Sequence, residues 1–157
     1  MPAAEHTWPV STALDEGAEW FVAFFPVRVA HWWNWLAVGK WKHCNCFRYN
    51  VPLGCWEVYS FDVTGLEVLH IGGERLSWLV DRWHGEGAEI LSVPQGREIS
   101  PFGNLLMNCV GVVKALVRQG GCALRPTALY WQLRKSGAVR AWGTVDGHEG
   151  QGSGTGS

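Results

Sequence analysis

The chain has 157 residues, a length that fits one domain with an adequate hydrophobic core. Hydrophobic residues make up 47% of it, which excludes a disordered protein, and a net charge of −1 gives no general electrostatic reason to expect nucleic acid or an anionic membrane as a partner. No apolar run reaches the ~18 residues of a membrane span, and the N-terminus lacks the basic and apolar regions of a signal peptide. The five cysteines are an odd number, so we expect free thiols in a reducing compartment or inside a particle assembled there.

Residues 1–18 are rich in Pro, Ala, Ser and Thr and predict an N-terminal arm, followed by a single domain over residues 19–146. A run of aromatic and β-branched residues over 19–27 predicts a strand that Pro26 ends or kinks. Residues 28–36 are expected to form a short helix dense in Trp. The chain has 11 tryptophans, too many for a domain of this size to bury completely. We therefore expect the cluster Trp32–Trp41 to be a core seam or an exposed contact surface, and we favour some interface use.

Two runs on either side of a turn signal at residues 50–54 predict a β-hairpin with strands over 42–49 and 56–63. Side chains alternate along a strand, so His43 and Asn45 share one face while Cys44 and Cys46 share the other. If Tyr49 pairs with Trp56, the register places Phe47 opposite Val58, Asn45 opposite Ser60, and His43 opposite Asp62. Further strands are expected over 66–71, 88–93 and 138–145.

Helices are predicted over residues 74–83, 103–121 and 126–135, the last with Pro at its first turn. The helix over 103–121 carries Cys109 and is expected to stop at Gly120 and Gly121. Its N-cap is either Asn104 or Asn108. If Asn108 is the cap, Cys109 takes the first helical position, where unpaired N–H groups and the helix dipole lower a thiol pKa and can hold an oxyanion. Alternatively, Cys109 is a core residue on an apolar stripe.

A thiol nucleophile needs a base, and the base needs a group that orients it. The chain offers Cys109, His43 and Asp62 for these three roles. Each has a simpler alternative: His43 as a hydrogen-bonded structural residue, and Asp62 as a turn residue before Thr64 and Gly65. It is their combination that predicts catalysis.

A metal site is a further alternative, because His43, Cys44, Cys46 and Cys55 have suitable ligand chemistry. Their spacing argues against it. Consecutive residues on a strand point to opposite faces, and Cys-x-Cys is not the usual zinc knuckle. We therefore predict neither a metal nor a cofactor.

Five segments of the chain carry a resemblance to known proteins: Phe21–Pro26, Lys42–Phe47, Trp56–Asp62, Asn108–Leu116 and Arg125–Leu133. They resemble a group of small phage-encoded proteins, which is similar to circularly permuted papain-like (NlpC-type) cysteine hydrolases. Lecithin retinol acyltransferase-like proteins share the same order, with a His-bearing strand before a helix that starts with "NC". The resemblance implies an α+β, circularly permuted papain-like fold in which an antiparallel sheet packs on the Cys-bearing helix. It also implies Cys109 as nucleophile, His43 as base and Asp62 as the third polar residue. Asn45 departs from the pattern, which usually has an apolar residue there.

The function implied is that of a tail-associated cysteine peptidase acting on cell-wall peptides. The alternative is a catalytically inactive structural component of a phage virion, in the tail or neck, that uses the same fold. Expected partners are other virion tail proteins and, as a possible substrate, a peptidoglycan peptide. The expected location is the virion, assembled in the bacterial cytoplasm. An acyltransferase is less favoured, because the Trp cluster is the only stretch that could face a membrane. Residues 147–157 have Gly/Ser-rich linker composition and predict a flexible tail.

Overall fold

The computed structural model describes residues 19–26, 39–62, 64–96 and 108–142. They form an α+β fold with one antiparallel six-stranded sheet, in the order β4-β3-β2-β1-β5-β6, and three helices. The predicted arm, the short helix over 28–36 and the Gly/Ser-rich tail lie outside the described residues. The strands are β1 (Glu19–Phe25), β2 (His43–Asn50), β3 (Cys55–Asp62), β4 (Gly65–Ile71), β5 (Glu89–Pro94) and β6 (Val139–Trp142), and the helices are α1 (Gly73–Gly85), α2 (Cys109–Val117) and α3 (Pro126–Lys135).

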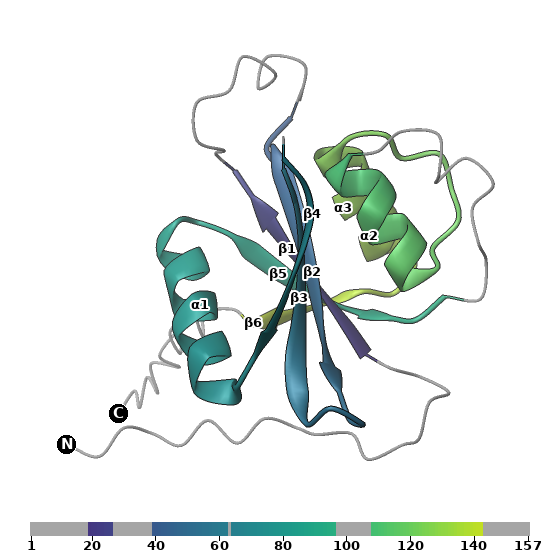
Figure 1. Ribbon diagram of the computed structural model, residues 1–157. Coiled ribbons are helices and arrows are strands. Elements are labelled where there is room, and N and C mark those ends of the chain that lie inside the picture. The colour runs from purple at the N-terminus through teal and green to yellow at the C-terminus, as the bar shows by residue number, and fades with distance from the viewer. Residues whose placement is uncertain (1–18, 27–38, 63, 97–107, 143–157) are drawn as a thin grey trace, which may run out of the picture.

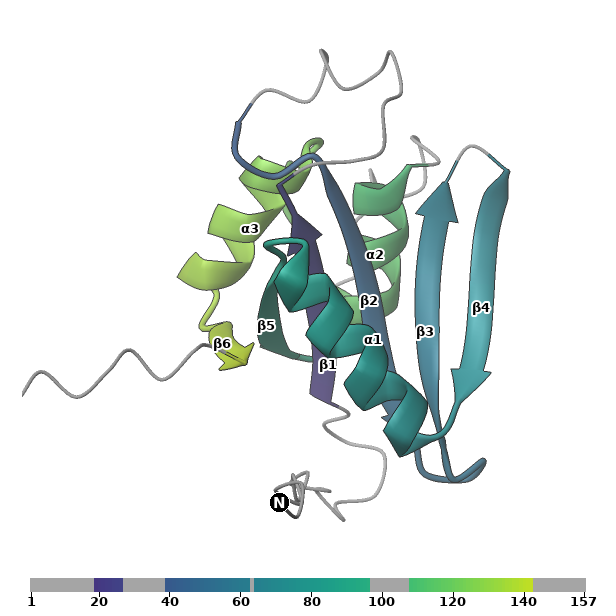
Figure 2. The ribbon, with the colours of Figure 1, turned by 90° about the vertical axis from the view of Figure 1, so that its left-hand side faces the viewer.

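The sheet separates two layers of helix. Helix α1 covers one face, and α2 and α3 lie side by side on the other (Figures 1 and 2). Each face has its own core: Phe24, Cys44 and Cys46 pack with α2 and α3, whereas Phe25 and Phe47 pack with α1. Successive side chains of β1 and β2 therefore point alternately into the two cores. The predicted α+β class and the packing of the sheet on the Cys-bearing helix are confirmed.

The β2–β3 hairpin has the predicted register. Tyr49 pairs with Trp56 and Phe47 with Val58, so large apolar side chains on the α1 face meet across the two strands. The ladder ends at the pair Cys46–Tyr59. The expected opposition of His43 and Asp62 lies beyond that end and is not part of the ladder.

Helix α2 is shorter than predicted. Asn108, in extended conformation, is its N-cap, and the Asn108 side chain accepts a hydrogen bond from the N–H of Gly111 at 2.8 Å. The helix ends at Val117 because Arg118 adopts the left-handed conformation, with φ 51°, before the expected stop at Gly120 and Gly121. Residues 103–107 of the predicted helix lie outside the described part. No helix among the described residues is long and apolar enough to cross a membrane.

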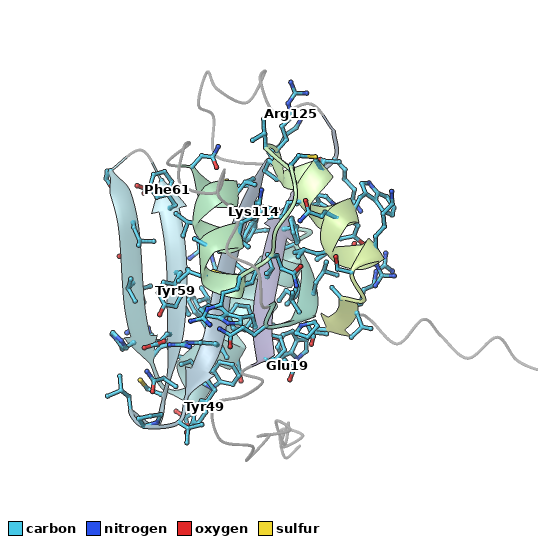
Figure 3. The ribbon with its side chains drawn as sticks, turned by 90° about the vertical axis from the view of Figure 1, so that its right-hand side faces the viewer. Glu19, Tyr49, Tyr59, Phe61, Lys114 and Arg125 are labelled. Carbon is cyan, nitrogen blue, oxygen red and sulfur yellow. The ribbon has the colours of Figure 1, made fainter. Side chains whose placement is uncertain are left out.

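A buried lysine ties the segment after α2 to the helix. Lys114 is 3% exposed, and its ammonium donates hydrogen bonds to the carbonyls of Gly121 and Ala123. From the other side, the Gln132 side chain of α3 donates to the carbonyl of Gly120 and accepts from the N–H of Ala123. The connection between the two helices is therefore bonded to both of them. Figure 3 shows Lys114 on the face of the molecule that carries α2 and α3.

Glu57 is a buried carboxylate at the centre of a polar cluster on β2, β3 and β4. It accepts hydrogen bonds from Arg48 Nε at 2.9 Å, Asn50 Nδ2 at 2.7 Å and Tyr59 OH at 2.9 Å, and His70 Nε2 lies 3.6 Å away. Burial alone would raise the pKa of this carboxyl group. The hydrogen bonds from Asn50, Arg48 and Tyr59, together with the Arg48 charge, outweigh burial and lower the pKa to about 2.

This cluster predicts a pH dependence of stability. The folded pKa of Glu57 lies below its ordinary value of 4.5, so its contribution is complete above about pH 4.5 and is lost as the pH falls towards 2. The shift corresponds to about 3 kcal/mol at most. We expect Glu57→Gln to remove this part of the acid sensitivity, measured by urea denaturation at neutral pH and inside that window. Glu67→Gln, on an exposed part of β4, is the matched control, and its free energy of unfolding should fall in acid as much as that of the parent. Equal acid sensitivity in the Glu57→Gln variant and the parent would contradict the assignment.

Candidate active site

Cys109 is the first residue of α2, directly after the Asn108 cap. This is the arrangement expected if Asn108 rather than Asn104 starts the helix. The thiol is half-buried and packs against the core that α2 and α3 share with the sheet. At this position it lies at the positive end of the helix dipole, among backbone N–H groups that have no partner one turn earlier in the helix.

Two residues of β2 lower the pKa of Cys109. A hydrogen bond with the Cys44 side chain has the largest effect, and burial opposes it. A hydrogen bond with His43, the charge of His43 and a backbone hydrogen bond from Cys44 lower the pKa further, so that it lies well below the ordinary value for a thiol. These interactions favour the thiolate, which is the reactive form of cysteine.

His43 reaches Cys109 at the end of the sheet. As the first residue of β2, it alternates with Cys44 and belongs to the α1 face, where its ring lies 5.9 Å from that of Phe25. The ring nevertheless remains within reach of the Cys109 thiol. His43 is only 7% exposed, so its position is fixed by packing.

Asn45 orients the His43 ring. His43 Nε2 lies 2.8 Å from Asn45 Oδ1, and both residues are buried on the same face of β2. Because Oδ1 can only accept, Nε2 is the protonated nitrogen of the neutral ring. Nδ1 is buried and has no partner at standard hydrogen-bond geometry among the described residues. Nδ1 is thus the nitrogen left to exchange a proton with Cys109, and such contacts often tighten only when substrate binds.

Asp62 does not pair with His43 across the hairpin, as the predicted register suggested. It is the exposed last residue of β3, and its Oδ1 accepts hydrogen bonds from the Thr64 N–H at 2.7 Å and the Thr64 hydroxyl at 2.6 Å. This is the geometry of a turn stabilised by an aspartate, the alternative that the sequence left open. His43, by contrast, lowers the pKa of Cys109 and forms a hydrogen bond with Asn45.

Two residues of the site were visible in the sequence without being assigned a role. Asn45 stands two positions after His43, so the alternation of a strand places both on one face, and an amide there can bond an imidazole. Cys44 lies on the face that meets α2. Strand alternation, applied to the interior of the "HCNC" segment, was the available signal for both.

The cysteines and acidic residues that the structure describes do not gather into a metal site. Within the described part of the chain, no group of three or more His, Cys, Asp or Glu side chains is placed to hold an ion. Cys46 is fully buried, and its burial raises the pKa of its thiol. Cys55 lies at the opposite end of β3 from Asp62. All five cysteines lie in the described part of the chain, and none of them is in a disulfide.

The chain matches no family model, no curated protein and no solved structure. The resemblance to permuted papain-like hydrolases therefore stays a prediction. What this site can do chemically rests on its own geometry.

The site predicts an acidic thiol at Cys109. In a background in which Cys55 and Cys122 are replaced by Ser, the pH profile of alkylation by a haloacetamide should have its midpoint well below the free value of ~8.5. We expect the midpoint to rise in His43→Ala and in Cys44→Ala, because each removes an interaction that favours the thiolate. A midpoint that is the same in the parent and His43→Ala would show that the two side chains do not interact.

Proposed function

We propose that this chain is a cysteine hydrolase with a circularly permuted papain-like arrangement, in which Cys109 is the nucleophile, His43 the base and Asn45 the residue that positions the base. One observation carries the proposal. A thiol at the start of a helix interacts with a histidine whose Nε2 is held by an amide and whose Nδ1 has no competing hydrogen-bond partner among the described residues. A nucleophile, a base and an orienting group in contact are the elements that acyl transfer requires.

The proposed reaction has two halves. The Cys109 thiolate attacks the carbonyl carbon of an amide or ester, with the thiol proton held at His43 Nδ1. The backbone N–H groups at the start of α2 lie where they can stabilise the oxyanion of the tetrahedral intermediate. His43 then gives its proton to the leaving group, and an acyl-enzyme remains. Water, deprotonated by the same nitrogen, hydrolyses the thioester and restores the thiol.

The substrate class comes from the resemblance described above. We propose a cell-wall cross-peptide as substrate and a phage tail as the location, since a tail-associated hydrolase would open the wall during infection. The substrate is tested by digestion of purified peptidoglycan, with the released amino groups counted. The sample is reduced protein in which Cys109 has been shown to be acidic. If this protein cleaves neither wall peptides nor small amide or ester substrates, the proposal that it is a hydrolase is wrong.

The roles within the site predict a ranking of variants. Cys109→Ala should abolish hydrolysis, and Asn45→Ala should lower kcat by about 10²-fold, because the imidazole loses the group that sets its tautomer and orientation. Asp62→Asn is the matched control and should retain most of the activity. A readout besides rate is available: Asn45→Ala should also shift the pH profile of kcat, whereas a purely structural defect would lower activity at every pH. Loss of activity in Asp62→Asn with full activity in Asn45→Ala would reverse the two assignments.

A second candidate function has its own supporting observation. Trp78 on α1 and Trp131 on α3 are each 59% exposed, on helices that cover opposite faces of the sheet. Large exposed aromatic residues are enriched in protein–protein interfaces. They favour a chain held between neighbours in an assembly, as a structural component of a virion would be.

The two functions predict different effects of the same substitutions. For a structural component, Trp78→Ser and Trp131→Ser should lower the amount of this chain in purified particles, because they remove exposed contact surface and leave the core intact. Cys109→Ala should leave that amount unchanged. If both tryptophan variants are incorporated as well as the parent, these two side chains do not serve assembly.

A further inference from the structure

Cys44 is a buried thiol that takes no chemical step in the proposed hydrolysis, although its hydrogen bond favours the Cys109 thiolate. It is 1% exposed and belongs to the core cluster against which Cys109 packs. Helix α2 packs on β2, and a hydrogen bond with the Cys44 side chain is the interaction that most lowers the pKa of Cys109. A disulfide between these residues would join the start of α2 to the start of β2, two elements that already pack together.

We propose that Cys44 is a resolving cysteine: after a hydroperoxide oxidises Cys109, Cys44 captures it in an intramolecular disulfide. Cys109 is the thiol that reacts first, because it is half-buried while Cys44 is enclosed. Its favoured thiolate form is also the form that peroxide oxidises. The site would then carry a reversible redox modification besides its hydrolytic chemistry.

The two steps balance with hydrogen peroxide as the oxidant. In the first, the Cys109 thiolate attacks one peroxide oxygen, the O–O bond breaks, and hydroxide leaves and takes a proton to become water. Cys109 becomes a sulfenic acid, oxidised by two electrons while the peroxide is reduced by two. In the second, the Cys44 sulfur attacks the Cys109 sulfur, the S–S bond forms and the S–O bond breaks. The hydroxyl group leaves as water with the Cys44 proton.

Position selects Cys44 among the other cysteines. Cys46 is on the same face of β2 but one strand repeat farther from its start, and it is fully enclosed, with a raised pKa. Cys55 opens β3 at the far end of the hairpin. Cys122 is exposed in the connection between α2 and α3.

The modification would protect the nucleophile. A sulfenic acid without a thiol partner is oxidised further, to sulfinic and sulfonic acids that ordinary thiols do not reduce. A disulfide to Cys44 stops the oxidation one step earlier. It also removes the nucleophile until a thiol reductant restores it, so hydrolysis would be lost in peroxide and recovered on reduction.

The test uses the full chain with Cys55 and Cys122 replaced by Ser. Reduced protein is freed of reductant, treated with a small excess of hydrogen peroxide, alkylated and analysed by intact mass and by peptide mapping. We expect the parent to lose two hydrogens and to yield a peptide pair linking Cys44 to Cys109 that dithiothreitol separates. Cys44→Ala should instead gain two or three oxygens on Cys109. Cys46→Ala, a truncation at a buried cysteine on the same face, is the matched control and should behave like the parent. Circular dichroism confirms that each variant is folded.

Two results would overturn the proposal: sulfinic acid on Cys109 of the parent with Cys44 still open to alkylation under denaturing conditions, or a disulfide that joins Cys109 to Cys46. If Cys44→Ala is not folded, the parent alone still decides, because the linked peptide pair either forms or does not. Hydrolysis is measured on the same samples before peroxide is added. A disulfide in a protein that cleaves nothing would contradict the proposed function alone, and cleavage without a disulfide would contradict this inference alone.

Discussion

The site depends on the contact between the first turn of α2 and the first residues of β2. The Asn108 cap fixes where the helix begins, and so it fixes Cys109 at the position where backbone N–H groups point outward. The strand supplies the other side of the contact, because His43 and Cys44 are consecutive residues at the end of the sheet. The N–H groups at the start of the helix and the side chains at the start of the strand therefore surround the sulfur from two directions. All of these polar groups belong to regular secondary structure and not to a loop.

The two-sided sheet explains how so small a domain can hold this contact rigidly. Alternate residues of β1 and β2 supply separate cores on the two faces, so β2 is packed from both sides along most of its length. Burial from both faces leaves little freedom to the side chains of His43 and Asn45, which are 7% and 9% exposed. The cost of ordering the imidazole and the amide is met when the chain folds, and not when a substrate arrives.

Periodicity in the sequence was sufficient to predict the described strands and helices, and the register of the hairpin as far as Cys46. Tyr49 and Trp56 pair as expected, and the β-branched and aromatic alternation of β2 and β3 leaves few other registers that bury one face. The extent of α2 could not be predicted in the same way, because Arg118 ends the helix in a left-handed conformation that no composition rule assigns to arginine. The apolar stripe ends at Val117, whereas the expected stop was placed at Gly120 and Gly121, the nearest residues that commonly take this conformation.

The candidate site was predicted in part for a related reason. Cys109 and His43 could be paired from chemistry and chain order, and the contact between them agrees with that pairing. The third residue was assigned by extending the hairpin ladder to Asp62, but the paired residues end at Cys46 and Tyr59. Where a ladder ends cannot be read from alternation, since the pattern is the same on both sides of the end. The nearer partner, Asn45, lies on the same strand as the histidine.

The bonds around Lys114 couple the two helices on this face. Its ammonium and the Gln132 amide hold the same short connection from opposite sides, and the hydrogen bonds include the backbone at Gly120, Gly121 and Ala123. A connection held in this way cannot act as a hinge, so α2 and α3 should open and close as one cooperative unit. Any motion that widens access to Cys109 by moving α2 away from the sheet must therefore move α3 as well.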